Sequence, residues 1–170
     1  MNAAIQNLVV HWGEMGSRWG ISRTVAQIHA LLYFTARPLA ADEIVEALGV
    51  ARSHVSNSLK ELQQWGVVST VHILGDRREH FQSLKDVWQM FEILLDERKR
   101  REVDPILKTL REATARIAEE AVEAPTRERL DEMLKFFELM DGWFGDIRRL
   151  PLSTRVKLIK LGGRVSKWIR

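Results

Sequence analysis

The chain has 170 residues, of which 45% are hydrophobic, and its formal net charge is +3 at pH 7. This size accommodates one compact domain or two tightly joined ones with an apolar core. The absence of cysteine excludes disulfides and thiolate metal ligands. No apolar run approaches the ~18 residues of a membrane span, and no basic segment precedes the first apolar residues as in a signal peptide. We therefore expect a cytoplasmic protein without a membrane partner.

Two amphipathic helices are predicted at the start of the chain. Apolar side chains recur at helical spacing over residues 3–16 and again over about 23–35. Ser22 can cap the second helix, and Arg37-Pro38 ends it. The first helix is expected to face the core, and the second is expected to pack beneath the segment that follows.

The functional interpretation depends on residues 39–84. A short helix begins near Asp42 and ends at Gly49, where the backbone needs a residue that tolerates positive φ. A second helix runs from about Arg52 to Trp65, because apolar residues recur there at spacings of four and three. This arrangement predicts a helix-turn-helix. The buried stripe of the second helix consists of Val55, Leu59 and Leu62.

The opposite face of the 52–65 helix carries short polar and long cationic side chains, which are the types that contact base edges and phosphates. These residues are Arg52, Ser53, Ser56, Asn57 and Lys60. A β-hairpin follows, with strands predicted over residues 67–74 and 79–84 and a turn between them. Arg77 and Arg78 at its tip suit a phosphate backbone or a narrow minor groove.

The same pattern has a second interpretation. A helix, a glycine turn and a helix also occur in small helical domains that do not touch DNA. Residues 1–84 hold equal numbers of basic and acidic side chains, so DNA binding would depend on where the few cations point. The alternative is therefore a winged-helix protein-interaction module without sequence-specific DNA binding.

The second half of the chain is predicted to be helical. A helix begins near Lys85, its end over residues 96–102 is densely charged, and a new start is expected at Asp104-Pro105. The charged run is expected to be a solvated face, with contact to DNA phosphates or to a partner subunit as alternatives. After Pro151 a basic amphipathic segment reaches the C-terminus. We expect it to pack on its own dimer, although such a segment could also lie on a membrane or on DNA.

The strongest periodic signal follows Ala124-Pro125. Its apolar stripe consists of Leu130, Met133, Leu134, Phe137, Met140 and Phe144, and it is widened by Phe136, Leu139 and Trp143. A surface helix in a monomer needs a narrower stripe. We therefore expect this helix to form the interface of a homodimer; the alternative is a central helix buried within one subunit.

Patterns typical of catalysis or metal binding are missing from the sequence. It lacks a Gly-x-x-x-x-Gly-Lys phosphate loop and a Gly-x-Ser-x-Gly nucleophile elbow. The histidines have no metal-ligand spacing, although His72 and His80 are expected on facing strands of the hairpin, as surface imidazoles. We expect no enzymatic activity, no metal and no cofactor.

The segment from Pro38 to Glu102 resembles the winged helix of MarR-type bacterial regulators, in particular the branch typified by the glycine betaine synthesis repressor (GbsR). The similarity covers about two thirds of the chain and thins out after residue 120. The matching segments are Pro38-Leu39, Asp42-Glu43-Ile44, Glu46-Ala47-Leu48-Gly49-Val50, Val55-Ser56, Leu59-Lys60-Glu61-Leu62, Trp65-Gly66-Val67-Val68, Gly75-Asp76-Arg77, Asp86-Val87-Trp88 and Glu97-Arg98-Lys99-Arg100-Arg101-Glu102.

The chain departs from the family pattern at several helix starts. Ala40 and Ala51 stand where the family tends to have a Ser or Thr cap, so Asp42 or Ser53 would have to replace the missing hydroxyls. The Lys-Gly-Asn opening of the second helix is replaced by Arg52-Ser53-His54. The tyrosine pair of the return strand is replaced by His80-Phe81.

The resemblance implies a mainly α-helical protein with a small β-hairpin wing. It implies a winged helix-turn-helix DNA-binding domain over residues 1–84 and an α-helical dimerisation region over 85–170. The expected function is that of a homodimeric transcriptional regulator, a repressor in the branch named above, which binds a double-stranded DNA operator. Helix 52–65 would enter the major groove, and the wing over residues 67–84 would lie on the flanking backbone or minor groove.

Individual contacts follow from this placement. Base contacts are expected from Arg52, Ser53, Ser56 and Asn57, and base or phosphate contacts from His54 and Lys60. Arg77 and Arg78 are expected at the backbone or minor groove, with Asp76 steadying one of them.

A small-molecule effector is also implied, because regulators of this family often respond to one. Four aromatic residues lie on segments that could line the gap between the two regions: Trp12, Trp19, Tyr33 and Trp88. Aromatic rings can cage a quaternary ammonium ion by cation–π attraction. Packing of the same rings in the core is the alternative.

Overall fold

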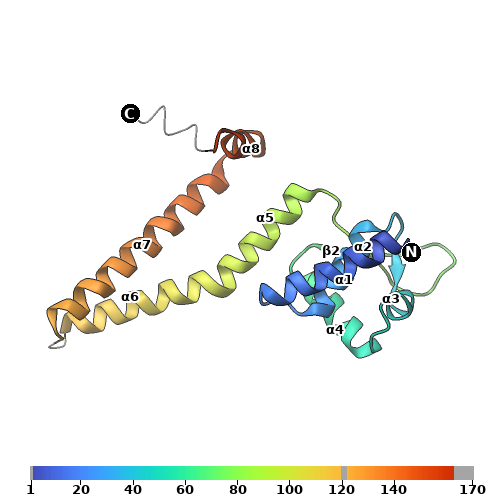
Figure 1. Cartoon of the computed structure of the whole chain (residues 1–170), viewed down its shortest axis with the longest axis horizontal. Helices are drawn as coiled ribbons and strands as arrows, with labels where there is room; N and C mark the ends of the chain where they lie inside the picture. The colour runs from blue at the N-terminus through green and yellow to red at the C-terminus, as the bar shows by residue number, and fades with distance from the viewer. Residues whose placement is uncertain (1, 120–121, 163–170) are drawn as a thin grey trace. The chain divides into compact units, whose positions relative to one another are not determined.

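The computed structural model describes residues 2–119 and 122–162. The chain forms two compact units, Met1–Arg98 and Lys99–Arg170. The described part is mostly helical with one small antiparallel sheet, as the sequence predicts (Figure 1). None of the helices in the described segments is long and apolar enough to cross a membrane.

The first unit contains the predicted helices and three short strands. The division between the units falls after Arg98 rather than after residue 84, because the last helix of the first unit contributes the buried Met90 to its core. The elements are α1 (Ala3–Arg18), α2 (Arg23–Phe34), β1 (Leu39–Ala40), α3 (Ala41–Leu48), α4 (Arg52–Gln64), β2 (Val68–Val71), β3 (His80–Ser83) and α5 (Val87–Arg98).

The sheet has the strand order β1-β3-β2, with both pairings antiparallel. Leu39 lies opposite Phe81, and Val68 lies opposite Ser83. Both hairpin strands are shorter than predicted, so residues 72–79 form a long loop rather than a tight turn. His80 pairs with Val71 and is buried, which corrects the expectation that it faces His72 as a surface imidazole.

The core of the first unit is built from one face of every helix and from the sheet. Ile28 of α2, Ile44 of α3 and Val55 of α4 have no exposed surface, and Val9 of α1 is 1% exposed. Such burial is the main favourable term in folding, at about 2 kcal/mol for each large aliphatic side chain. The buried stripe predicted for α4 is confirmed.

Two glycines allow α1 to approach α2 closely. A Cβ atom at Gly16 would lie 2.5 Å from the Cβ atom of Ala26, and one at Gly13 would lie 2.5 Å from Cγ of Gln27. The Gln27 side chain can move aside, but the alanine methyl cannot. Gly16 therefore sets the distance between the two helices.

Lys85 joins the segment after β3 to the end of α2. Its Nζ atom donates to the backbone carbonyls of Leu32 and Tyr33, both at 2.7 Å, and of Thr35 at 2.9 Å. These carbonyls belong to the last turn of the helix, where they lack partners within the helix and where a cation is favourable. The side chain thus caps α2, which has no glycine at its C-terminus.

The second unit is a helical hairpin followed by a shorter helix. Its elements are η1 (Lys99–Val103, a π-helical segment), α6 (Asp104–Glu119), α7 (Ala124–Arg149) and α8 (Leu152–Leu161). The segment α6 begins at Asp104 as expected, but Asp104 is itself helical and follows η1 directly, so it does not cap a new helix. Lys99 pairs with Asp141 at 2.7 Å, and Arg111 with Glu138 at 3.1 Å, so ion pairs connect the two arms of the hairpin. The end of the predicted basic segment, residues 163–170, lies outside the described residues.

His29 of α2 is a titratable group inside the core of the first unit. It is 5% exposed, and its Nε2 atom has no hydrogen-bond partner among the described residues. Burial, helped by the charge of Lys85, lowers the pKa of His29 from 6.5 to about 4. The folded protein therefore keeps this imidazole neutral at pH values where the unfolded chain would protonate it.

This difference predicts a loss of stability in acid. Between pH 6.5 and about 4 the unfolded state binds a proton that the folded state does not, so the stability contributed by neutral His29 declines as the pH falls through this window. Urea unfolding at about pH 7 and about pH 4.5 should show a decrease about 2 kcal/mol larger for the wild type than for His29→Leu. His11→Leu, at a histidine side chain that is 74% exposed, is the control and should behave as the wild type. Equal decreases in wild type and His29→Leu would contradict the assignment.

Candidate nucleic-acid interface

Helix α4 presents all of its predicted contact residues to solvent. Val55, Leu59 and Leu62 are buried against the rest of the unit. The residues on the outward side are all exposed: Arg52, Ser53, His54, Ser56, Asn57 and Lys60. None of these six side chains forms a hydrogen bond or ion pair with another residue within 2–119 or 122–162. Their donors, acceptors and charges are therefore available to a ligand.

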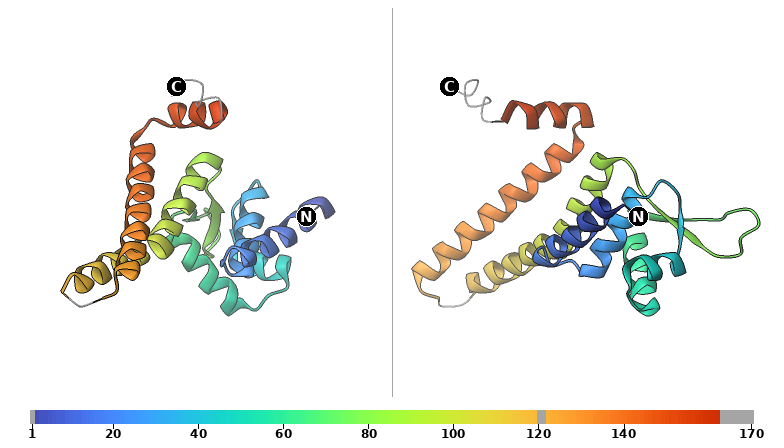
Figure 2. Two further views of the ribbon diagram at one scale, coloured as in Figure 1. Left: turned by 60° about the vertical axis from the view of Figure 1, so that its left-hand side comes forward. Right: turned by 45° about the vertical axis from the view of Figure 1, so that its right-hand side comes forward.

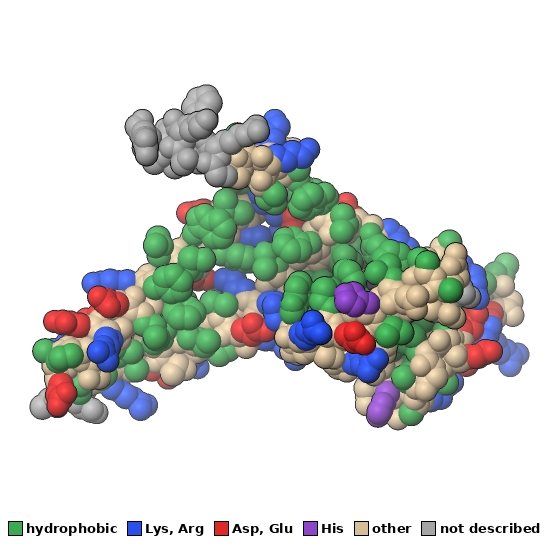
Figure 3. Space-filling view, in the orientation of Figure 1, with side chains coloured by type: hydrophobic (Ala, Val, Ile, Leu, Met, Phe, Trp, Pro, Cys, Tyr) green, Lys and Arg blue, Asp and Glu red, His purple; other side chains and the backbone are tan. Residues whose placement is uncertain are grey.

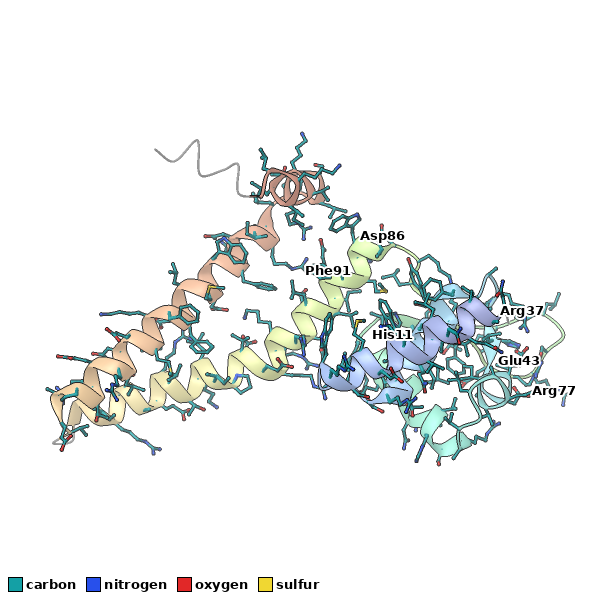
Figure 4. The ribbon with its side chains drawn as sticks, viewed as in Figure 1. His11, Arg37, Glu43, Arg77, Asp86 and Phe91 are labelled. Atoms are coloured by element: carbon teal, nitrogen blue, oxygen red, sulfur yellow. The ribbon has the colours of Figure 1, made fainter. Side chains whose placement is uncertain are left out.

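Helices α3 and α4 both lack a Ser or Thr cap, and their N-termini differ in what replaces it. At α3 the carboxylate of Glu43 accepts a hydrogen bond from the backbone N–H of Ala40 at 2.8 Å, which is the half of a capping box that the residue at the third helical position provides. Hydrogen bonds from Arg37 hold this carboxylate in place and, with the Ala40 N–H, lower the pKa of Glu43 to about 2 (Figure 4). At α4 the N-cap residue Ala51 provides no side-chain cap, and the expected replacement by Ser53 is not found.

A crevice of 390 Å³ separates α4 from the base of the wing. The N-terminus of α3, the outward side of α4 and strand β3 form its walls. Its charged lining combines acidic and basic groups from three segments: Asp42, Arg52, Lys60, Arg78 and Glu79. The crevice therefore places three of the predicted α4 contacts, Arg52, Ser56 and Lys60, beside one of the predicted wing contacts, Arg78.

Arg78 ties the wing to α3. Its Nη2 atom lies 2.7 Å from Oδ2 of Asp76, and its Nη1 atom donates to Oδ2 of Asp42 at 2.9 Å. The backbone N–H of Arg78 also donates to Oδ1 of Asp76 at 3.0 Å. The guanidinium holds the pKa of Asp76 well below its usual range and lowers that of Asp42. The Asp42–Arg78–Asp76 cluster thus fixes the base of the loop against the start of α3.

Arg77 differs from its neighbour in having no such partner. It is exposed, and its side chain makes no hydrogen bond or ion pair to any residue in the described part of the chain. The 72–79 loop that carries it projects from the first unit (Figure 2), and Arg77 lies on its outer side (Figure 4). Of the two arginines predicted at the wing tip, Arg78 is held internally by Asp76 and Asp42, and Arg77 is free to contact a ligand.

The four aromatic residues proposed to bind an effector are engaged in other ways. Trp12 and Tyr33 pack partly buried against the core of the first unit. The ring of Tyr33 lies 5.7 Å from Nζ of Lys85, so a cation of the protein itself already occupies a position near it. Trp19 lies 5.6 Å from the guanidinium of Arg98, and Trp88 is 38% exposed. Among the described residues no group of three or more acidic or histidine side chains is placed to hold a metal ion.

The residues of the predicted dimerisation stripe on α7 differ in their exposure to solvent. Leu130, Leu134, Phe137 and Phe144 are half-buried, whereas Met133 and Met140 are 52% and 43% exposed. The residues that widen the stripe are also exposed: Phe136, Leu139 and Trp143. Figure 3 shows hydrophobic side chains gathered along the hairpin of α6 and α7. None of the described residues of the second unit covers this side of α7.

Two of these features were not predictable from sequence patterns. Asp42 pairs with Arg78, which is 36 residues away in the sequence. Lys85 bonds to carbonyls about fifty positions earlier. A sequence pattern has no signal for such long-range pairs, because any acidic residue in the first helix of the motif could have been the partner.

The helix pair α3–α4, the supporting helix α2 and the three-stranded sheet with its long loop define a winged helix-turn-helix domain. The likeness to one solved structure agrees with this fold. The crystal structure of a transcriptional regulator has the same fold, with a TM-score of 0.64 and 19% identity, covering 84% of this chain and 94% of the other. A transcriptional regulator from Thermotoga maritima gives a TM-score of 0.40 and 21% identity, covering 81% and 89% of the two chains.

The sequence comparisons find similarity to transcriptional regulators. Residues 14–79, from the end of α1 to the wing, match the model of the MarR family. YvaV of Bacillus subtilis, assigned by name to the helix-turn-helix-type transcriptional regulators, is 22% identical over 135 residues, covering 78% of this chain and 76% of the relative. The match to the family model spans the helix-turn-helix and the wing, which are the segments that form the candidate interface.

The Asp42–Arg78 ion pair predicts a specific change in mobility. Both side chains are 50% exposed, so the pair should add little to global stability. Asp42→Asn should nevertheless accelerate hydrogen exchange of the amides in residues 72–79, because the loop loses its tie to α3, while the melting temperature changes little. Glu46→Gln, at an exposed acidic residue of the same helix, is the matched control. Unchanged exchange in Asp42→Asn would show that Asp76 alone holds the loop.

Proposed function

We propose that the protein is a homodimeric transcriptional regulator that binds double-stranded DNA in a sequence-specific manner. The observation that carries the proposal is the row of side chains on α4 without internal partners, next to an unpaired arginine on the wing. Arg52, Lys60 and Arg77 are exposed cations without ion pairs to other described residues. Phosphate contacts by such residues provide most of the affinity of DNA-binding proteins.

The start of α4 supports a position close to the DNA backbone. The first turn of a helix has N–H groups without intrahelical partners, and they attract anions. Because Ala51 supplies no cap, these groups remain available near Arg52. Ser56 and Asn57 lie one turn further along the same exposed side, where short polar side chains can contact base edges in the major groove.

The apolar side of α7 supports dimerisation. Leu139 is 71% exposed and Trp143 is 57% exposed, and contiguous apolar surface of this kind is typical of a subunit interface. In a two-fold symmetric dimer each exposed residue of the interface is used twice. Two α4 helices related by this symmetry would bind two half-sites about one helical turn apart, or a small multiple of that spacing.

The finer assignment to the GbsR-like branch is part of the proposal. It rests on the sequence similarity that continues beyond the wing, through Asp86-Val87-Trp88 and the charged run of residues 97–102. The assignment to this branch implies a repressor role, a cytoplasmic location and control by a small molecule. Because Lys85 already lies beside Tyr33 and Arg98 beside Trp19, we place any effector contact of the aromatic residues at Trp12 or Trp88.

A protein-interaction module is the second candidate function. It is favoured by the balance of charges in residues 1–84, since a strongly basic surface is absent from the sequence there. The two candidates differ in their dependence on salt. DNA binding releases counterions and weakens steeply with salt, whereas docking of a protein need not.

Fluorescence anisotropy with labelled DNA separates these functions. The duplex should come from the region upstream of the protein's own gene, with a random duplex as the control, at about 50 and about 200 mM salt. A steep loss of affinity with salt and a preference of about 10³-fold or more for the specific duplex are expected. Binding without preference would reduce the proposal to non-specific DNA binding, and no binding at either salt would favour the interaction module.

Arg77 and Asn57 should have different roles in this assay. Arg77→Ala should weaken binding to every sequence and reduce the salt dependence, because it removes a phosphate contact. Asn57→Ala should instead relax the preference at one base pair by about 1–3 kcal/mol. His72→Ala, in the same loop as Arg77, is the control. Equal losses on specific and random DNA for both variants would contradict this division.

The proposed interface predicts a change of oligomeric state. Leu139→Glu places a charge in the centre of the exposed apolar side of α7, twice in each dimer, and should convert the dimer to a monomer in size-exclusion chromatography with light scattering. Thr126→Glu, on the exposed first turn of the same helix, is the matched control and should remain dimeric. A dimeric Leu139→Glu would place the interface elsewhere.

A further inference from the structure

The wing ends in an apolar tip. Leu74 is fully exposed, with a relative accessibility of 104%, and its neighbour Ile73 is 41% exposed. Single exposed apolar residues are common on protein surfaces, so exposure alone has no meaning. This pair differs because it belongs to the loop that projects from the first unit (Figure 2), and Leu74 comes three residues before the unpaired Arg77.

The tip is a defined turn. The backbone N–H of Asp76 donates to the carbonyl of Ile73 at 3.0 Å, which closes a four-residue turn with Leu74 and Gly75 at its centre. Gly75 has φ +85°, a conformation that a side chain at this position would strain. Leu74 therefore projects from a turn whose backbone is constrained on both sides.

The turn is also attached to the rest of the domain. Its last residue, Asp76, accepts hydrogen bonds from the backbone N–H and the guanidinium of Arg78, and the same guanidinium donates to Asp42 on α3. The turn hydrogen bond, the Asp76–Arg78 pair and the Arg78–Asp42 pair thus connect the apolar tip to the helix pair α3–α4. A backbone held in this way loses little conformational entropy when its turn enters a binding site.

We propose that Leu74, supported by Ile73, inserts between neighbouring base pairs from the minor groove and bends the operator. This inference rests on the proposed function of DNA binding. Minor-groove proteins use apolar wedges of this type to unstack a base step partly and to bend the duplex. The unpaired Arg77 follows in the same loop, and a cation there suits the phosphates that border a narrow groove.

The wedge adds a source of specificity that requires no hydrogen bond to a base. Pyrimidine–purine steps are easier to unstack than other steps, so the operator should carry such a step at the position of each wing. Base contacts of α4 and deformability at the wing would then select the same site independently. The expected partner is therefore duplex DNA that has an easily unstacked base step beside each half-site, where the wing enters the minor groove.

Two fluorescence signals test the wedge on the full-length protein. Energy transfer between dyes at the two ends of the operator duplex reports bending, and 2-aminopurine at the step contacted by the wing reports unstacking. The wild type should increase both signals. Leu74→Ala should bind about tenfold more weakly, as expected for the loss of most of a buried leucine side chain, and should lose both signals. Leu74→Met, which restores a long apolar side chain, should recover them, and His72→Ala should match the wild type.

The possible outcomes separate this inference from the proposed function. Specific binding by the wild type without bending or unstacking would overturn the wedge and leave the regulator intact. Failure of the wild type to bind any duplex would overturn both. A change of oligomeric state in Leu74→Ala, measured by light scattering without DNA, would show that a second copy covers the tip and would also overturn the wedge. Loss of both signals in Leu74→Ala with recovery in Leu74→Met supports it.

Discussion

The guanidinium of Arg78 lies between Asp76 of the wing and Asp42 of α3, and the geometry of the candidate interface depends on this position. Without it, the long loop would be attached to the domain only through the ends of β2 and β3. The ion pairs are half-exposed, so their contribution to global stability is small. Their effect is instead positional, because they set where Arg77 and the apolar tip lie relative to α4. The same interaction removes Arg78 from the group of free cations, although its sequence position beside Arg77 suggests an equivalent role.

Internal pairing also resolves an apparent conflict between charge and function. The first half of the chain is electrically balanced, which is unusual for a DNA-binding surface. Asp42, Asp76 and Glu43 are, however, occupied by Arg78 and Arg37. The two arginines therefore offset most of the negative charge of these three carboxylates, while Arg52 and Lys60 have no such partner among the described residues. The field at the interface is determined by which charges are paired rather than by the net charge of the domain.

The helix-turn-helix could be predicted from the sequence because apolar spacing and helix-ending residues, which act over a few positions, determine that segment. The spacing of Val55, Leu59 and Leu62 predicts the buried side of α4, and Gly49 does adopt the left-handed conformation expected at the end of α3, with φ +63°. Strand β1 escaped prediction because two residues cannot show an alternating pattern, and only its pairing with β3 makes it a strand. The placement of α5 in the first unit depends on the burial of Met90, a tertiary contact. The roles of Asp42 and Lys85 likewise depend on partners far away in the sequence.

The second unit gives an independent physical reason for a partner subunit. Leu107 and Leu110 of α6 are its only buried hydrophobic residues in the described part of the chain, and no described residue of α7 is buried. A two-helix hairpin with so small a core would be marginally stable in water, because little apolar surface is removed to offset the loss of chain entropy. The ion pairs of Lys99 and Arg111 orient its two arms but are too exposed to replace a core. Covering Leu139 and Trp143 with the same surface of a second copy would complete a shared core, so that the association that stabilises the hairpin would also set the spacing of the two half-sites in the proposed complex with DNA.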